Sequence, residues 1–239
     1  MLIVSIPKSA STSLLDTFGK LHALPSQQLT FKHYEKSDLF PLLGKYHPDA
    51  KLLGSSELHE FALDDKLYKQ HVLPTADNLS LLKNIKKVVL LRNPYDIVLA
   101  YRRAELKSIH GKKSEFEGKV TEGEWLQAAE NNGLLNELKE FNNKWIKEAE
   151  KNSNVLIIHY RELTQDTHKV INKMEAFYNL PVTTKKIALS KKRYSRHSFL
   201  KQAHSNLRAY LMEVVIRYHV YERLKSWQAY LRNHGISWV

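Results

Sequence analysis

The 239-residue chain contains no cysteine. Disulfide bonds, thiolate nucleophiles and zinc sites built on cysteine are therefore excluded. Glycine is scarce, with 8 residues, and the chain has no internal repeat or low-complexity tract. No apolar run approaches the roughly 20 residues of a transmembrane helix, and the N-terminus lacks the charged and apolar regions of a signal peptide. The sequence therefore predicts a cytoplasmic protein.

Acidic residues are also fewer than basic residues. Lysine and arginine number 37 against 25 acidic residues, which gives a formal net charge of +12. A balance of this kind bears on partners and not on fold. It favours an anionic ligand: a nucleotide, an acidic or sulfated glycan, nucleic acid or an anionic membrane surface. Hydrophobic residues make up 43% of the chain, which is enough for a real core.

Short apolar runs alternate with segments of helical periodicity along the chain. The predicted strands are residues 2–6, 51–56, 87–91 and 155–159, with a weaker candidate at 29–34. Helices are expected over residues 13–24, 40–46, 96–106, 164–178 and 206–231. Residues 79–85 are expected to form the end of a further helix, and residues 124–150 a long helical stretch with a break near 131–133. This alternation predicts one α/β domain over residues 1–239 with a mostly parallel sheet. Its core is about residues 1–182, followed by a basic loop and C-terminal helices over 183–239.

Ligands of such sheets bind beyond the carboxyl ends of the strands. The loop after the first strand is small and polar, and a helix follows it directly: Ile6-Pro7-Lys8-Ser9-Ala10-Ser11-Thr12-Ser13. Four hydroxyls, one lysine and the first N–H groups of the helix are suited to a phosphate or sulfate. The lysine stands at the front of the loop and no glycine is present, so this is not the Gly-Lys-Ser/Thr loop of nucleoside triphosphatases.

The same loop resembles the 5′-phosphosulfate loop of sulfotransferases that use 3′-phosphoadenosine 5′-phosphosulfate (PAPS). That motif reads Pro-Lys-Ser/Thr-Gly-Ser/Thr-Ser/Thr, and the chain matches it at five of six positions. Ala10 stands where the family has glycine, and a left-handed backbone at this position would carry a steric cost. The resemblance implies that Lys8, Ser9, Ala10, Ser11, Thr12 and Ser13 hold the donor's 5′-phosphosulfate.

Two later segments resemble the same family. The run Leu91-Arg92-Asn93-Pro94-Tyr95-Asp96 is similar to its 3′-phosphate motif, and the resemblance gives that phosphate to Arg92, whose guanidinium suits it. The family's serine falls on Ala100, so Arg102, Arg103 or Arg193 is a candidate replacement. Residues 155–163 and 169–181 resemble the family's late strand and helix, which would place Tyr160 near the adenine. The three matches occur in the family's order over residues 2–182.

The resemblance implies in-line transfer of a sulfuryl group, with Lys8 stabilising the leaving phosphosulfate and 3′-phosphoadenosine 5′-phosphate (PAP) as product. An acceptor hydroxyl or amine needs a general base. His59 is the first candidate because its ordinary pKa lies near 6.5, Glu57 the second and His33 the third. No metal-ligand pattern is evident, and no metal is expected. The acceptor is expected to be a glycan or a small molecule.

Two other classes remain open. A basic nucleic-acid-binding domain would fit the net charge and the aromatic residues within the basic segment 185–201. A kinase of the phosphate-loop class would need Gly-Lys-Ser/Thr and a magnesium carboxylate, neither of which is found. A weakly active sulfotransferase is a third possibility, suggested by Ala10 and Ala100.

Overall fold

The structure is a computed structural model of the chain, and it describes residues 1–27, 39–46, 55–63, 65–106 and 114–190. The chain divides into two units, Met1–Lys191 and Lys192–Val239, and all described residues belong to the first. None of the described helices is long and apolar enough to cross a membrane. A single domain over the whole chain stays a prediction.

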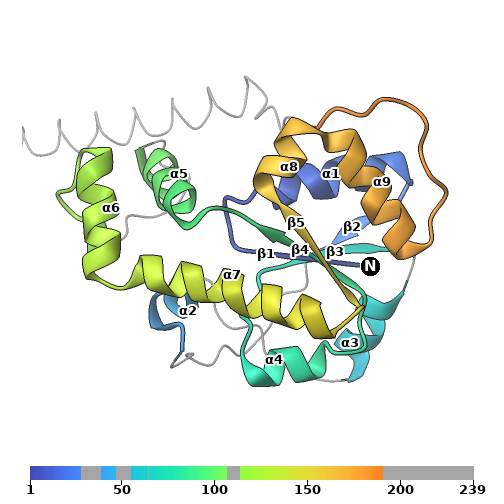
Figure 1. The fold of residues 1–239 in the computed structure, drawn as a ribbon, viewed down its shortest axis with the longest axis horizontal. Helices are drawn as coiled ribbons and strands as arrows, with labels where there is room; N and C mark the ends of the chain where they lie inside the picture. The colour runs from blue at the N-terminus through green and yellow to red at the C-terminus, as the bar shows by residue number, and fades with distance from the viewer. Residues whose placement is uncertain (28–38, 47–54, 64, 107–113, 191–239) are drawn as a thin grey trace, which may run out of the picture. The chain divides into compact units, whose positions relative to one another are not determined.

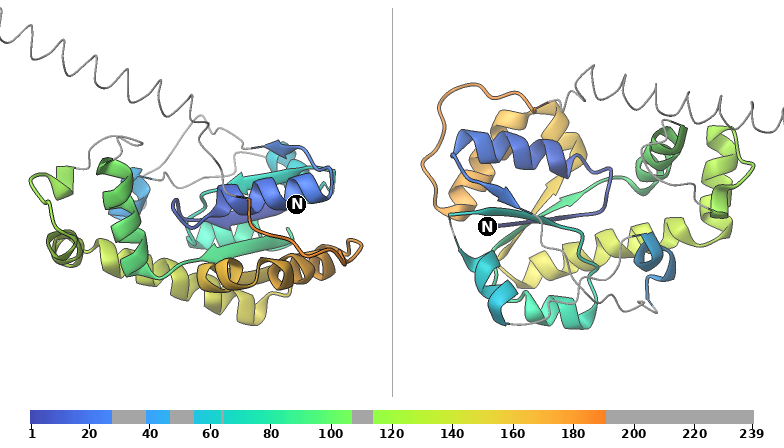
Figure 2. Two further views of the ribbon diagram at one scale, coloured as in Figure 1. Left: turned by 90° about the horizontal axis from the view of Figure 1, so that it is seen from above. Right: turned by 180° about the vertical axis from the view of Figure 1, so that it is seen from behind.

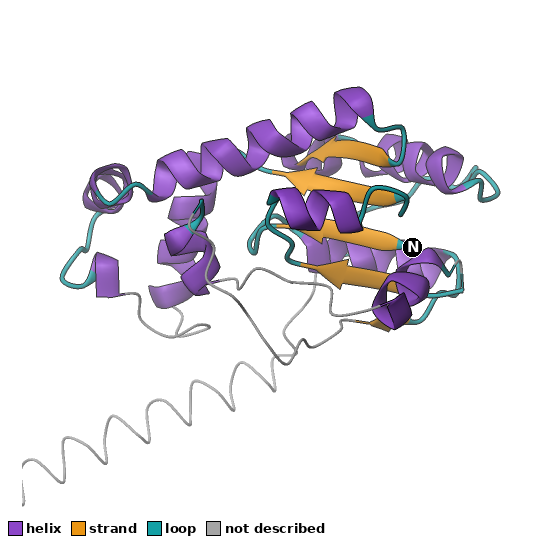
Figure 3. Ribbon diagram, turned by 90° about the horizontal axis from the view of Figure 1, so that it is seen from below, coloured by secondary structure: helices purple, strands orange, loops and turns teal. Residues whose placement is uncertain are grey.

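A parallel sheet forms the centre of the first unit. Its strands are β1 (Leu2–Ser5), β2 (Ser26–Gln27), β3 (Leu67–Gln70), β4 (Lys87–Leu91) and β5 (Val155–His159). Their order is β2-β3-β1-β4-β5, and every neighbouring pair is parallel. Figure 3 shows the strands side by side with their arrows pointing the same way. The carboxyl ends of β3, β1, β4 and β5 therefore meet at one edge.

Helices cover both faces of this sheet because the inner strands are apolar on both sides. Val89 and Leu91 of β4 join the core on one face, and Val88 and Leu90 join the core on the other. The first face carries α2 (Pro41–Tyr46), α3 (Ser55–Ala62), α4 (Ala76–Leu81) and α7 (Leu134–Lys151). The second carries α1 (Ser11–Leu21), α8 (Tyr160–Gln165) and α9 (Thr167–Tyr178). Figure 1 shows these two layers. The prediction of an α/β fold with a mostly parallel sheet is confirmed.

The remaining helices follow β4. They are α5 (Pro94–Leu106), the 3₁₀ turn η1 (Ser114–Phe116) and α6 (Glu122–Asn131). A capping box starts α6, in which Thr121 and Glu124 each accept the other's backbone N–H. Gly133, at φ 88°, separates α6 from α7, so the predicted break at residues 131–133 is confirmed. Figure 2 shows the segment after α9 running past α1, where the Ser190 N–H donates to the Thr17 hydroxyl at 2.8 Å.

A buried lysine lies at the start of β4. Lys87 is fully buried, and its ammonium donates to the carbonyls of Leu82 and Ile85, each at 2.8 Å. Burial lowers the pKa of Lys87 to about 8, although the negative charge of Glu148 acts in the opposite direction. The side chain thus satisfies two carbonyls of the turn that follows α4, at the cost of desolvating a charge.

Three predicted elements need comment. The predicted strand at 51–56 is wrong at its end, because Ser55 and Ser56 begin α3; residues 51–54 and the candidate strand at 29–34 lie outside the described residues. The structure has two strands that the sequence did not predict, β2 and β3. The helix expected to end at 79–85 stops at Leu81, and α8 is an additional helix before α9.

Candidate active site

The connection from β1 to α1 is built to present backbone N–H groups. Lys8 and Ala10 both have left-handed backbones, with φ of 71° and 66°. Ala10 occupies the N-cap position of the 11-residue helix α1, and no side chain caps its first turn. An alternation of left-handed residues at a helix start forms a concave nest of amides, and the helix dipole adds positive potential there. The backbone of the loop alone is therefore suited to bind an anion.

The backbone of Ala10 settles the question raised by the missing glycine. Alanine would have been accommodated at a negative φ, but the φ here is 66°. A side chain in this region costs roughly 1–2 kcal/mol. The loop therefore keeps the backbone shape of a glycine-containing loop and carries the strain of a methyl group.

The side chains of the loop lie close to the sheet. Ser9 is 1% exposed, and neither its hydroxyl nor that of the buried Ser5 has a hydrogen-bond partner among the residues the structure describes. Lys8 is half-buried, and burial lowers its pKa. The ammonium of Lys69, from β3, lies 3.3 Å from the Thr12 hydroxyl. Buried hydroxyls without partners are exceptions in proteins, and here they line a loop suited to an anion.

Arg92 meets this loop from the end of β4. Its guanidinium stacks on the Tyr160 ring with 4.0 Å to the ring centroid, and it donates a hydrogen bond to the carbonyl of Lys8. The Nε of Arg92 is buried and has no partner within the described part of the chain. The pKa of Arg92 is lowered, and burial is the largest of the several causes. Three residues that the sequence assigned to one nucleotide, Lys8, Arg92 and Tyr160, are thus brought together.

Ala100 lies two turns into α5 and is 8% exposed. Its methyl group offers no donor, as the sequence implied. Of its suggested replacements, Arg102 donates through Nε and Nη2 to the carbonyl of Val120, at 2.9 and 2.6 Å. Arg193 and the third base candidate, His33, lie outside the described residues.

The structure places the first two base candidates away from the loop. Glu57 and His59 belong to α3, which precedes β3. The Met1 ammonium donates to the carbonyls of Leu63 and Lys66 at 2.6 and 2.9 Å, so the chain after α3 lies at the amino end of β1. His59 is exposed near the end of that helix. The predicted strand before this segment is contradicted at Ser55 and Ser56, which belong to α3, and its remainder lies outside the described residues.

A different histidine stands at the ligand edge. His71 follows β3, the strand paired with β1, and its Nδ1 lies 2.7 Å from the Ser5 carbonyl oxygen. A carbonyl only accepts, so Nδ1 carries the proton and Nε2 is the basic nitrogen. The pKa of His71 is lowered to about 4, mainly by burial and to a smaller extent by the charge of Lys69, although the hydrogen bond to the Ser5 carbonyl acts in the opposite direction. The ring is therefore neutral at physiological pH, and sequence reasoning missed it because β3 was missed.

A model of the sulfotransferase domain family matches residues 1–232. The chain belongs to the sulfotransferase family. No curated protein matches it. Among solved structures, mouse sulfotransferase SULT7A1 complexed with PAP aligns with a TM-score of 0.51 at 17% identity, over 86% of this chain and 62% of its own. A sulfotransferase from Alicyclobacillus acidocaldarius aligns with a TM-score of 0.48 at 14% identity, over 87% and 91% of the two chains. This chain thus spans less than two thirds of the mouse protein.

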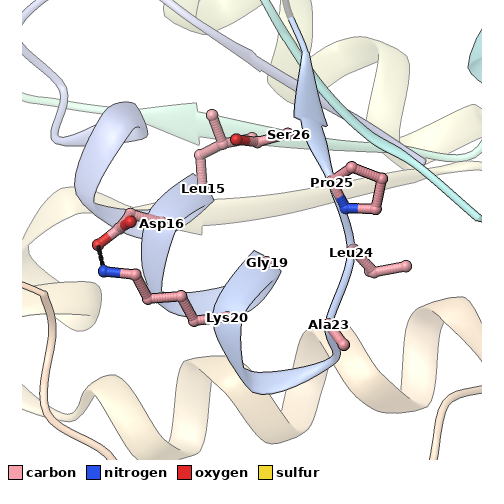
Figure 4. A pocket seen from close by; sticks show the side chains of 8 residues that line it. All are labelled: Leu15, Asp16, Gly19, Lys20, Ala23, Leu24, Pro25 and Ser26. Carbon is pink, nitrogen blue, oxygen red and sulfur yellow. Dashed lines mark hydrogen bonds and ion pairs between the residues drawn. The ribbon is translucent and has the colours of Figure 1, made fainter.

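Two further features of this sulfotransferase lie apart from the loop. A hollow of about 450 Å³ is lined by α1 and the chain leading into β2: Leu15, Asp16, Gly19, Lys20, Ala23, Leu24, Pro25 and Ser26. Figure 4 shows it, with Asp16 and Lys20 joined by an ion pair of 3.0 Å. It lies toward the far end of α1 from the anion loop. Within the described residues, no group of three or more His, Asp or Glu side chains could hold a metal ion.

Proposed function

We propose that this sulfotransferase transfers a sulfuryl group from PAPS to a hydroxyl or amine of its acceptor. The observation that carries the proposal is the convergence of Lys8, Arg92 and Tyr160 on an uncapped helix start. Two half-buried cations and a nest of amides face one edge of the sheet, and an anionic nucleotide is the ligand that such a site suits. The family membership of the chain supports the same chemistry.

The donor's two charged ends are assigned to different residues. The amides and hydroxyls of Ser9, Ala10, Ser11, Thr12 and Ser13 hold the 5′-phosphosulfate. Arg92 holds the 3′-phosphate, and Tyr160 lies near the adenine. The unpartnered Nε of Arg92 and the unpartnered hydroxyl of Ser9 favour these assignments, because bound anion oxygens would give both groups the acceptor they lack.

Catalysis on this proposal is mainly electrostatic. The acceptor oxygen attacks sulfur, the bond between sulfur and the bridging oxygen breaks, and its electron pair leaves with PAP. Lys8 stabilises the charge that develops on the bridging oxygen. The half-buried position of Lys8 strengthens this interaction, because a charge acts more strongly where water is partly excluded.

His71 replaces His59 and Glu57 as the proposed base. Its Nδ1 is held by the Ser5 carbonyl, two residues before the loop, and this contact fixes the tautomer in which Nε2 accepts a proton. The acceptor's proton passes to Nε2 as the new bond to sulfur forms. Neither of the α3 candidates has a comparable position beside β1.

The acceptor class is proposed from charge. A net charge of +12 attracts acidic substrates, so an acidic or hydroxyl-rich glycan is the first candidate and a small alcohol or phenol the second. The match also covers only 62% of the length of mouse sulfotransferase SULT7A1.

The first test is thermal unfolding with and without PAP, for the wild type and for Lys8→Ala and Arg92→Ala. Ligand at 100 times its Kd stabilises the folded state by about 2.7 kcal/mol, which raises Tm by roughly 5–10 °C for a domain of this size. We expect this rise in the wild type, a loss of it in Arg92→Ala, and no equal effect of ATP or AMP.

The absence of any rise at millimolar PAP would refute the proposal. Salt-dependent binding of DNA or RNA in its place would support the nucleic-acid interpretation. Binding of PAP together with transfer of labelled sulfate from PAPS to a mixed glycan pool would complete the assignment. Histidine variants then distinguish the candidate bases.

A further inference from the structure

The α5 helix presents one face toward the proposed 3′-phosphate position. Ala100 lies four residues after Asp96 and three before Arg103, so these three positions share a face of the helix. The chain enters α5 directly from β4, whose end carries Arg92. The charges of both Asp96 and Arg103 act on the guanidinium of Arg92, one raising and the other lowering its pKa.

The two neighbouring arginines of α5 have different environments. Arg102 is held by the Val120 carbonyl and lies 3.6 Å from a carboxylate oxygen of Glu122. It fastens α5 to the start of α6. Arg103 is exposed and makes no hydrogen bond or ion pair within the described residues. Its guanidinium is therefore available to a ligand, whereas that of Arg102 is occupied.

The positive charge of Arg103 acts unfavourably on Arg92, and an anion bound between the two guanidinium groups would remove this repulsion. Like charges repel, and Arg92 is half-buried, where screening by water is weaker. A phosphate between the two guanidinium groups would turn this repulsion into two charge-assisted interactions. The methyl group of Ala100 leaves that phosphate without a hydroxyl donor from the helix.

We propose that Arg103 binds the 3′-phosphate of the donor together with Arg92, and so supplies the contact that Ala100 cannot make. This inference rests on the proposed function, because it concerns the same nucleotide. It identifies Arg103 as a residue that determines specificity: recognition of 3′-phosphorylated nucleotides by this chain depends on a pair of arginines from β4 and α5. The exposed guanidinium reaches the phosphate from the solvent side, opposite the half-buried Arg92.

The test compares PAP with AMP, which differ only by the 3′-phosphate. Calorimetry gives the Kd of each nucleotide for the wild type, Arg103→Ala and Lys147→Ala. Lys147 is an exposed lysine of α7 and serves as a control for the loss of one positive charge. Because Arg103→Ala removes one charge-assisted contact, it should raise the Kd of PAP about tenfold and leave the Kd of AMP unchanged. Lys147→Ala should change neither Kd by more than about twofold.

Ala100→Ser provides the complementary measurement. A hydroxyl at position 100 should restore much of the PAP affinity in the Arg103→Ala background, and it should gain less in the wild type, where Arg103 already binds the phosphate. Non-additive effects of this kind are expected when two groups bind the same phosphate.

The outcomes separate this inference from the proposed function. If the wild type binds PAP more tightly than AMP and Arg92→Ala removes the difference, the donor site stands. An unchanged ratio of PAP to AMP affinity in Arg103→Ala would then overturn the role of Arg103 alone, as would an equal loss for both nucleotides. A wild type that does not distinguish PAP from AMP would overturn both.

Discussion

Replacement of Ala10 by glycine should stabilise this protein, although most substitutions destabilise. The φ of 66° at Ala10 costs an alanine roughly 1–2 kcal/mol that a glycine does not incur. Glycine also increases the freedom of the unfolded chain, which costs about 0.4–1 kcal/mol. The difference predicts a net gain of about 0.5–1 kcal/mol, or a rise in Tm of roughly 1–4 °C.

The chain contains two controls for this substitution. Ala23, just after α1, also has a left-handed backbone, with φ of 51°, and lies away from the anion loop. Ala23→Gly should therefore give a gain of similar size. Ala128 lies inside α6, where glycine costs about 1 kcal/mol relative to alanine. Urea unfolding followed by circular dichroism would measure all three variants.

The pattern of the three results decides the argument. Gains in Ala10→Gly and Ala23→Gly with a loss in Ala128→Gly would show that backbone strain is the cause. A loss of stability in Ala10→Gly of the same size as in Ala128→Gly would refute the strain at the loop. Affinity for PAP should stay within about threefold, because the backbone shape that presents the amides is already formed with alanine.

Two further predictions concern titratable groups. His71→Asn should lower kcat by roughly 10²- to 10⁴-fold with PAP binding retained, whereas His59→Asn should leave kcat unchanged; the reverse result would return the base to α3. Because the pKa of His71 is lowered to about 4, kcat/KM should not fall as the pH drops from 7 to 5.5. For Lys87, the folded pKa of about 8 lies below the usual 10.5, so the unfolded chain binds more protons between these values and stability rises with pH there. Urea unfolding at pH 7.5 and 9 should show this rise, at most about 3 kcal/mol over the full interval, in the wild type but not in Lys87→Met.

The elements that the sequence predicted well are those whose local pattern is unambiguous. β4 is a continuous apolar run because both faces of this inner parallel strand are covered by helices. β5, at the edge of the sheet, is also a continuous run with β-branched residues up to His159. The break between α6 and α7 is marked by Gly133, whose left-handed backbone few other residues adopt. Each of these features is determined by neighbours in the chain, so the sequence is sufficient to find them.

β3 could not be recognised in the same way. Its residues are Leu67, Tyr68, Lys69 and Gln70, and two of the four are polar although the strand lies between β2 and β1. Tertiary contacts hold polar atoms of this strand: the Tyr68 hydroxyl donates to Glu60, and the Lys69 ammonium lies 3.3 Å from the Thr12 hydroxyl. The local sequence pattern does not predict these contacts, because Glu60 and Thr12 lie 8 and 57 residues away from Tyr68 and Lys69.

The choice of base candidates from the sequence depended on that single missed strand. Residues 51–56 are the last strand predicted before β4, so His59, which closely follows them in the chain, is the first candidate from the sequence. In space, β1 lies between β3 and β4, and the residue that follows the carboxyl end of β3 is His71. Sheet order depends on the packing of whole βα units and not on the pattern within any one of them. The residues of the loop between β1 and α1 could be proposed from the sequence because they are contiguous, whereas the proposed base His71 lies beside them only through the pairing of β1 with β3.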